Sequence, residues 1–294
     1  HDLVADGEDR EDRLDRAELF DAVIEPGDFA GHGDRGPTSH RTDAMRVAPI
    51  SLATAFEPFD RAEARRKLGL DPNRPALLLA PGAGSLSRID SAARAVLDAV
   101  TGGSERWQVA ITRQAIAQHE IKPSDADVDV VELHHLYPLS RHLLAFDAAV
   151  SAAGYNSIHE QLALGIPTLI LPSEAKTDDP QTRARILAED GLALVASPDD
   201  LESVRRQTHR LLDPQVRAEL TSAMSELPKA DGAVESARII GDLAAHGAVV
   251  RDVPPARRGI ISRMLAVSGP SVMTTDIGEA TRAHGEHLMF DDVD

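Results

Sequence analysis

Six short apolar runs alternate with stretches of helical periodicity between about Ala76 and Ser197. The runs are "PALLLA", "WQVAIT", "VDVVEL", "DAAVSA", "PTLILP" and "LALVAS". Continuous apolar runs of this length are typical of strands that are buried on both faces of a parallel sheet. Their alternation with helices indicates right-handed βαβ units. We therefore expect an α/β protein with a Rossmann-like, doubly wound parallel sheet.

The helices predicted between these strands have recognisable ends. Asp60 can cap a helix that runs to Leu68 and stops at Gly69. Further helices are expected over residues 90–100, 157–164, 181–189, 199–212, 214–227 and 232–245, with a helical turn over 138–145. Ahead of the regular pattern, we expect a strand over residues 20–24 that ends before Pro26, and a short apolar stretch that is broken by Pro49.

Composition narrows the class of protein. The chain has 294 residues, 42% of them hydrophobic, which is enough to bury a core in one large domain or two ordinary ones. A net charge of −17 argues against a general nucleic-acid binder, since phosphate neutralisation needs clustered lysine and arginine. A nucleotide ligand stays compatible, because backbone N–H groups and helix N-termini can hold a phosphate. Disulfides are excluded because the chain has no cysteine.

Neither a signal peptide nor a membrane-spanning run is recognisable in the sequence. Residues 1–19 are acidic and highly charged, and no apolar run approaches the ~20 residues that a membrane-spanning helix needs. The sequence begins at His1 rather than at a methionine, so we expect a fragment or a processed form.

Ligands of doubly wound sheets bind at the carboxyl ends of the strands, and two turns there carry small and polar residues. The first, in "LLLAPGAGS", places Gly82, Gly84 and Ser85 directly after a strand. Small residues let a phosphate approach the backbone, but this is neither G-x-G-x-x-G nor a P-loop. A tight turn between strand and helix explains the motif as well as phosphate binding does.

The second turn lies in "SAAGYNSIHEQ", where Gly154 ends a strand and a helix follows. Asn156 and Ser157 are good N-cap residues that would leave N–H groups facing a crevice. Ser157 and Glu160 also have the spacing of a capping box, which is a purely structural explanation. The functional alternative makes Glu160 the acceptor for two ribose hydroxyls, a common use of carboxylates in nucleotide folds. Both interpretations stay open at this point.

Taken together, these stretches carry a family resemblance. "FDAAVSAAGYNSIHEQLALGIPTLILP", followed by "DDPQTRARILAEDGLALV", resembles the C-terminal domain of glycosyltransferase family 28. That family includes the bacterial N-acetylglucosaminyl transferase of lipid-linked peptidoglycan precursor synthesis. The shared pattern is small-Gly-x-x-Ser/Thr-hydrophobic-x-Glu, then Gly-x-Pro, a strand ending in proline and a helix with glutamine. The resemblance covers about residues 75–196, and it implies the GT-B fold and a nucleotide-sugar donor.

The resemblance also implies roles for individual residues. Glu160 matches the glutamate that holds the donor's ribose, and Leu136 matches the position whose backbone reads the base, with His135 beside it. The loop beside the diphosphate is matched by Gly154, Tyr155, Asn156 and Ser157. The glycine-rich loop is matched by Gly84 and Ser85. The contacts with the donor sugar are matched by Asp178, Asp179 and Gln181.

The sequence departs from the family pattern in two places. The family often has paired glutamines where this chain has "TDDPQ", and Pro180 leaves the register of Gln181 open by one residue. The arginine that contacts the diphosphate has no clear counterpart, so Arg88 and Arg141 are the candidate substitutes.

We expect no metal ion and no cofactor, with the nucleotide sugar as substrate. The histidines in "ELHHL" and His159 lack the spacing of zinc ligands. Asp178 and Asp179 could bind a divalent ion beside a diphosphate, but a solvated acidic loop explains them better. Nor does any serine, histidine and aspartate set suggest a nucleophile. The catalytic residues stay unknown, and His32 and His40 are the candidates ahead of the donor domain.

The resemblance implies three parts. Residues 1–50 would be the end of an N-terminal acceptor-side domain or a linker, 51–247 the donor-binding domain, and 248–294 a C-terminal crossover or tail. In GT-B enzymes the N-terminal domain holds the acceptor and supplies the catalytic base. We therefore expect a donor domain with a remnant of a second domain.

The resulting hypothesis is a glycosyltransferase. It would transfer a hexosyl or N-acetylhexosaminyl group from a nucleoside-diphosphate sugar, with UDP preferred, to an acceptor hydroxyl of a lipid-linked or polysaccharide component of the cell envelope. Two alternatives stay open: a non-catalytic donor-binding half that works with a partner subunit, and an NDP-sugar epimerase of the same fold. The resemblance implies a cytoplasmic protein and leaves peripheral membrane association open.

Overall fold

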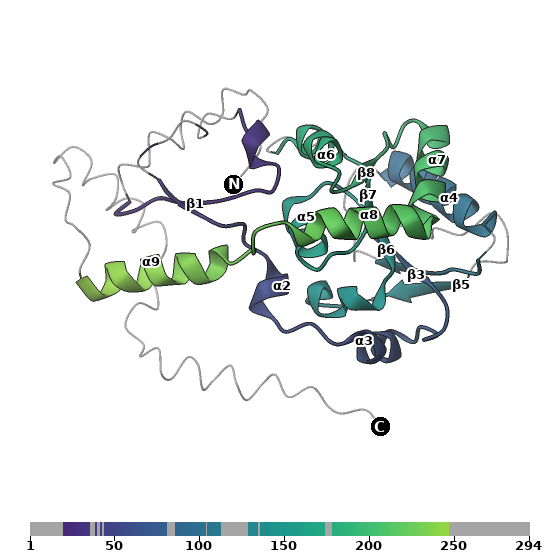
Figure 1. Cartoon of the computed structure of the whole chain (residues 1–294), viewed down its shortest axis with the longest axis horizontal. Coiled ribbons are helices and arrows are strands. Elements are labelled where there is room, and N and C mark those ends of the chain that lie inside the picture. The colour runs from purple at the N-terminus through teal and green to yellow at the C-terminus, as the bar shows by residue number, and fades with distance from the viewer. Residues whose placement is uncertain are drawn as a thin grey trace, which may run out of the picture. The chain divides into compact units, whose positions relative to one another are not determined.

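The computed structural model describes residues 20–35, 39, 42, 44–80, 86–103, 105–112, 129–134, 136–173 and 178–246. All of these residues belong to one compact unit of the chain, His1–Gly247. They form a six-stranded sheet covered by helices and a separate two-stranded sheet (Figure 1).

The larger sheet is parallel throughout and has the strand order β5-β4-β3-β6-β7-β8. Its strands are β3 (Ala76–Ala80), β4 (Gln108–Thr112), β5 (Asp129–Leu133), β6 (Ala148–Ser151), β7 (Thr168–Ile170) and β8 (Leu194–Val195). The chain builds outward from β3 to β5, then returns to the other side of β3 to add β6, β7 and β8. This topology confirms the doubly wound α/β fold that the apolar runs predict.

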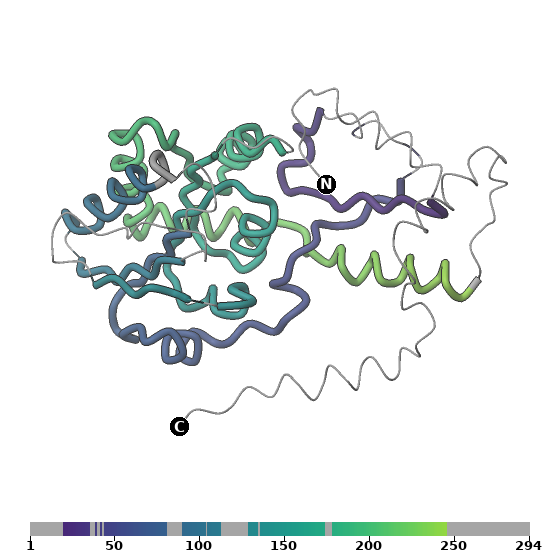
Figure 2. The backbone as a smooth tube through the Cα atoms, turned by 180° about the vertical axis from the view of Figure 1, so that it is seen from behind, coloured from purple at the N-terminus to yellow at the C-terminus, as the bar shows by residue number. Residues whose placement is uncertain are grey.

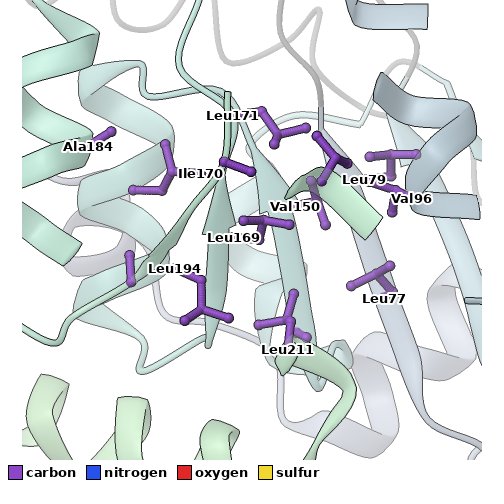
Figure 3. Close-up of a cluster of buried hydrophobic side chains, with 14 of the residues drawn as sticks. Leu77, Leu79, Val96, Val150, Leu169, Ile170, Leu171, Ala184, Leu194 and Leu211 are labelled. Atoms are coloured by element: carbon purple, nitrogen blue, oxygen red, sulfur yellow. The ribbon is translucent and has the colours of Figure 1, made fainter. Parts of the chain in front are cut away.

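Alternate residues of the central strands feed two separate cores. Leu77 and Leu79 of β3 belong to the larger core, while Leu78 packs into the smaller one. Figure 3 shows the larger core, where Val150 of β6 and Val96 of α4 gather with the β3 leucines. Burial on both faces explains why the central strands β3 and β6 are continuous buried runs, whereas the edge strand β5 carries exposed Asp129 and Glu132.

The helices around this sheet have the ends that local capping chemistry specifies. They are α2 (Leu52–Ala55), α3 (Arg61–Leu68), α4 (Leu86–Thr101), α5 (Tyr155–Ala163), α6 (Pro180–Glu189), α7 (Leu201–Leu212), α8 (Pro214–Ser225) and α9 (Gly232–His246), with the 3₁₀ segments η3 (Gly31–Gly33) and η4 (Leu139–Ala145). The side chain of Asp60 accepts a hydrogen bond from the N–H of Glu63, and Gly69 ends α3 with a φ of 68°. Both predicted ends of α3 are confirmed.

A fully buried arginine ties α3 to the amino-terminal edge of the sheet. Arg65 is 2% exposed, and its guanidinium pairs with Asp147 at 2.8 Å. Its remaining N–H groups donate to the backbone carbonyls of Ala145, Asp71, Pro72 and Arg74. One side chain therefore holds the loop of residues 71–74 and the residues just before β6 together.

The smaller sheet pairs β1 (Ile24–Pro26) with β2 (Met45–Val47) in parallel. The prediction of a strand over residues 20–24 is wrong, because the strand begins at Ile24 and includes Pro26. Proline is tolerated at this position since it ends the strand, where the N–H of the next residue, Gly27, donates to the carbonyl of Val47.

Helix α9 lies beside this smaller sheet rather than on the larger one (Figure 2). Glu235 of α9 accepts a hydrogen bond from the N–H of Ala48 at 2.7 Å. Gly232 approaches so closely that a Cβ atom there would lie 1.9 Å from the carbonyl oxygen of Ala48. A bridge between Ile50 and Asp231 completes the contact. None of the described helices is long and apolar enough to cross a membrane.

Candidate functional site

The order of the strands places a topological switch point at the carboxyl ends of β3 and β6. The connections that leave these two neighbouring strands run in opposite directions, because β3 leads to β4 on one side and β6 leads to β7 on the other side. In doubly wound sheets, ligands bind at such a switch point. Ser151 is the last residue of β6, and the turn that follows it leads directly into α5. The start of α5 is therefore the first place to look for a site.

Helix α5 begins two residues earlier than predicted. Gly154 is its N-cap residue and provides no side-chain hydrogen bond, so Asn156 and Ser157 lie inside the first turn. The interpretation of these two as N-caps is wrong, and so is the capping box of Ser157 with Glu160. The first hydrogen bond within the helix is donated by Ile158 to Gly154. The N–H groups of residues 155–157 are thus left for a ligand, as in anion sites at helix N-termini.

Glu160 lies one turn further along α5 with a buried carboxyl group. It is 8% exposed, and within the described part of the chain its carboxylate has no hydrogen bond or ion pair. Burial alone raises its pKa from 4.5 to about 7. An ionised carboxylate that is largely buried without a partner is costly, and such groups concentrate at functional sites. Because Ser157 and Glu160 form no capping box, this environment favours the interpretation of Glu160 as a ligand-binding carboxylate.

The side chain of Tyr155 has a structural role. Its hydroxyl donates to the carbonyl of Gly27 at 2.7 Å and accepts from the N–H of Ile50 at 3.1 Å. The phenol therefore joins α5 to the two segments that flank the smaller sheet, and burial raises its pKa above the ordinary value. For the diphosphate role predicted from the resemblance, only the backbone N–H of Tyr155 is available.

Ser151 is a polar residue at the site that sequence analysis missed. It is 1% exposed, and among the described residues its hydroxyl has no hydrogen-bond partner, although it ends β6 beside Ala80 of β3. Buried hydroxyls normally find partners, so each exception needs an explanation. The available signal was a lone serine at the end of the apolar run "DAAVS".

The segment predicted to contact the donor sugar lies at the start of α6, next to α5. Asp179 caps α6 by accepting from the N–H of Thr182 at 2.9 Å, and Pro180 occupies the first helical position. Asp178 receives two hydrogen bonds from Arg183. Both carboxylates thus have structural partners, whereas Gln181 is exposed and donates only a 3.4 Å bond to Pro172. A role for these residues in sugar binding stays a prediction.

A buried charge cluster, formed by Asp28, His159, Arg183 and Asp178, lies behind these two helix starts. Asp28 contacts Arg183 at 2.9 Å and His159 at 3.4 Å, and its side chain is 1% exposed. Burial by itself raises the pKa of Asp28, but the contacts with His159 and Arg183 and the N–H of Ala30 lower it to about 2. His159 stacks on Phe29, and its Nδ1 lies 2.7 Å from the carbonyl oxygen of Tyr155. It therefore belongs to this cluster.

The remaining predicted residues are placed less fully. Leu136 follows β5 and packs against the smaller core, and among the described residues its backbone groups make no hydrogen bond. A free backbone is what reading a base edge requires. Arg141 stacks on Phe59, with its guanidinium 4.1 Å from the ring centroid.

Several predicted positions lie outside the described residues: Gly84, Ser85, His40 and His135, and the side chain of Arg88. Among the described residues, no group of three or more histidine and acidic side chains is arranged to hold a metal ion. The near-surface His32 contacts Asp190 at 3.6 Å. His142 is buried and packs edge-on against Phe59, beside the smaller core.

The parallel sheet, its strand order and the helix start at its switch point define the class: this is a doubly wound α/β domain, the architecture of which GT-B enzymes have two. The family follows from comparison with known proteins. Residues 91–236 match the glycosyltransferase family 28 C-terminal domain, so the chain carries a domain of that family. The resemblance inferred from the sequence is confirmed.

Relatives at the level of whole proteins are distant. Two carry the name UDP-N-acetylglucosamine–N-acetylmuramyl-(pentapeptide) pyrophosphoryl-undecaprenol N-acetylglucosamine transferase. The one from Nocardioides sp. is 26% identical over 186 residues, which is 62% of this chain and 51% of that protein. The one from Exiguobacterium sp. is 30% identical over 148 residues, 49% of this chain and 40% of that protein. The chain thus spans about half the length of the curated relatives it matches.

Solved structures agree with this assignment of the fold. MurG of Acinetobacter baumannii superposes with a TM-score of 0.57 at 14% identity, over 82% of this chain and 65% of its own. The spinosyn rhamnosyltransferase SpnG superposes with a TM-score of 0.50 at 16% identity, over 74% and 56% respectively. At these identities the likeness concerns the GT-B fold alone.

Proposed function

We propose that this chain binds a nucleoside-diphosphate sugar and provides the donor side for transfer of its hexosyl or N-acetylhexosaminyl group to an acceptor hydroxyl. The observation that carries the proposal is Glu160, a buried carboxylate without a described partner on the helix whose free N–H groups begin at the switch point. A ribose offers two hydroxyl donors, which would satisfy that carboxylate and offset its desolvation.

The groups of α5 suit successive parts of such a donor. The diphosphate would accept hydrogen bonds from the N–H groups of residues 155–157, and the helix dipole would favour its charge. When the sugar leaves for the acceptor, negative charge grows on the diphosphate, so the same groups would stabilise the transition state. The backbone of Leu136 would read the base, the loop of Gly84 and Ser85 would flank the phosphates, and Gln181 would contact the sugar.

UDP is the expected nucleotide, because UDP-N-acetylglucosamine appears in the names of the two relatives above. Those names also support a lipid-linked acceptor. The base that activates the acceptor hydroxyl is expected on the acceptor side of the full enzyme. A second candidate is a donor-binding half that acts with a partner subunit.

Thermal unfolding of the chain at pH 8 with UDP, GDP, dTDP, CDP and ADP in turn tests the proposal. A ligand at about 100 times its dissociation constant should stabilise the fold by about 2.7 kcal/mol. The shift should be lost in Glu160→Ala and kept in Glu226→Ala, a change at an exposed glutamate of α8's C-cap. Absence of a shift with all five nucleotides would refute the donor site. Supplying the acceptor half as a separate chain then distinguishes a partner-dependent protein from a self-sufficient one.

A further inference from the structure

Arg183 is a fully buried cation in the first turn of α6. It is 0% exposed, and the four hydrogen bonds of its guanidinium reach three separate segments of the chain. Nε donates to Asp28 at 2.9 Å, and Nη1 and Nη2 donate to the two oxygens of Asp178 at 2.7 and 2.9 Å. Nη1 also donates to the carbonyl of Ala153 at 2.8 Å.

These partners are the parts of the molecule that shape the candidate site. Ala153 directly precedes Gly154, the N-cap of α5, and Asp178 directly precedes Asp179, the N-cap of α6. Asp28 belongs to the segment after β1, which also contacts α5 through Tyr155. One side chain therefore fixes the starts of two neighbouring helices relative to each other.

A role in stability alone explains this arrangement poorly. A cation is unfavourable in the first turn of a helix because of the helix dipole, and burying it adds a desolvation cost. Hydrophobic residues of similar volume usually stabilise a protein at least as well as a buried ion pair does. Attraction of an anion does not explain it either, since the guanidinium is fully buried and is already paired with the carboxylates of Asp28 and Asp178.

The carbonyl of Ala153 gives the functional reason. A backbone carbonyl beside a bound diphosphate would repel it, whereas the N–H groups of residues 155–157 attract it. By donating to the carbonyl of Ala153 from inside the protein, Arg183 holds the oxygen inward and leaves the N–H groups of α5 facing the switch point. The planar fork of arginine suits this task, because it engages a carboxylate and a carbonyl in fixed directions.

We propose that Arg183 is a positioning residue for the diphosphate group of the donor, which it serves through Ala153 and Asp178 without touching the ligand. This inference rests on the proposed function. It assigns a purpose to Asp178 that differs from sugar contact: the carboxylate orients Arg183.

The test measures dissociation constants for UDP and for UMP with the wild-type chain and with Arg183→Met, Arg183→Lys and Asp178→Asn. If UDP is not the nucleotide that stabilises the wild type most, the best diphosphate of the panel above and its monophosphate replace the pair. We expect each variant to bind the diphosphate at least 10-fold more weakly and the monophosphate less than 3-fold more weakly. Lysine should not rescue binding, since it keeps the charge but lacks the fork.

Arg185→Met is the matched control, because Arg185 lies on the same helix, is exposed and, among the residues that the structure describes, pairs with Glu189 alone. It should bind as the wild type does. Should Arg183→Met fail to fold, Asp178→Asn decides, since the Asp178 side chain is 19% exposed and Arg183 keeps its pair with Asp28. Equal loss for both ligands, or no loss in Asp178→Asn, would overturn the inference. If the wild type binds no nucleotide, the proposed function itself fails.

Discussion

Replacing Glu160 by glutamine should change how the stability of the protein depends on pH. The folded protein raises the pKa of this carboxyl group from 4.5 to about 7, with burial as the cause. The folded state therefore holds the proton more tightly than the unfolded chain does. Its contribution to stability is complete below pH 4.5 and is lost as the pH rises through 7. Each unit of difference between the folded and unfolded pKa corresponds to about 1.4 kcal/mol. Full ionisation of Glu160 therefore lowers the free energy of unfolding by about 3 kcal/mol.

Urea unfolding at a series of pH values from 4.5 to 8.5 measures this effect. Other groups titrate in the same range, so the informative quantity is the free energy of unfolding of the wild type minus that of Glu160→Gln. The difference should fall by about 3 kcal/mol from the lowest to the highest pH, whereas Glu226→Gln should follow the wild type throughout. A parallel course for wild type and Glu160→Gln would show that the carboxyl group is not buried, and would remove the main support for the donor site.

Three further substitutions test the framework around the site. Arg65→Met should lower the free energy of unfolding by about 1.5–3 kcal/mol, because it removes the buried donor that Asp147 and four backbone carbonyls share, while Arg66→Met at the exposed neighbouring position should change little. Gly232→Ala should lower the free energy of unfolding by about 1–3 kcal/mol because of its contact with Ala48. Gly241→Ala, in open space on the same helix, should raise it by about 0.5–1 kcal/mol. Asp60→Ala should cost about 1 kcal/mol through loss of the α3 cap. Chemical denaturation measures all of them, and equal effects within either pair would contradict the assigned contacts.

The larger sheet was predictable because its strands are defined by their own sequence. Runs such as "ALLLA" are apolar at every position, and burial on both faces leaves no other place for them. The ends of α3 were predictable for a similar reason, since Asp60 and Gly69 act through hydrogen bonds and dihedral angles within a few residues of themselves. The importance of Glu160 was visible too, although its sequence spacing allowed a capping role as well.

Contacts between distant segments set the limit of prediction. Asp28 and Arg183 are 155 residues apart, and nothing in either local sequence indicates that they pair. The start of α5 was misjudged because Ser157 is a better N-cap by type than Gly154, yet the turn after β6 places the glycine at that position. The strand at Ile24 was misplaced for the same reason, since its partner is Met45 and not a neighbour in sequence.

The contact between Ala48–Ile50 and Ala230–Gly232 has a consequence for how this protein can be rearranged. The N–H of Gly232 donates to the carbonyl of Pro49, and the hydroxyl of Thr54 donates to that of Ala230. The stretch from Ile50 to Asp231 therefore starts and finishes at one spot, with the whole six-stranded sheet between. This stretch is therefore suited to circular permutation: a short peptide could join its two ends, and new termini could be opened in a surface loop. The permuted gene should still encode the same sheet.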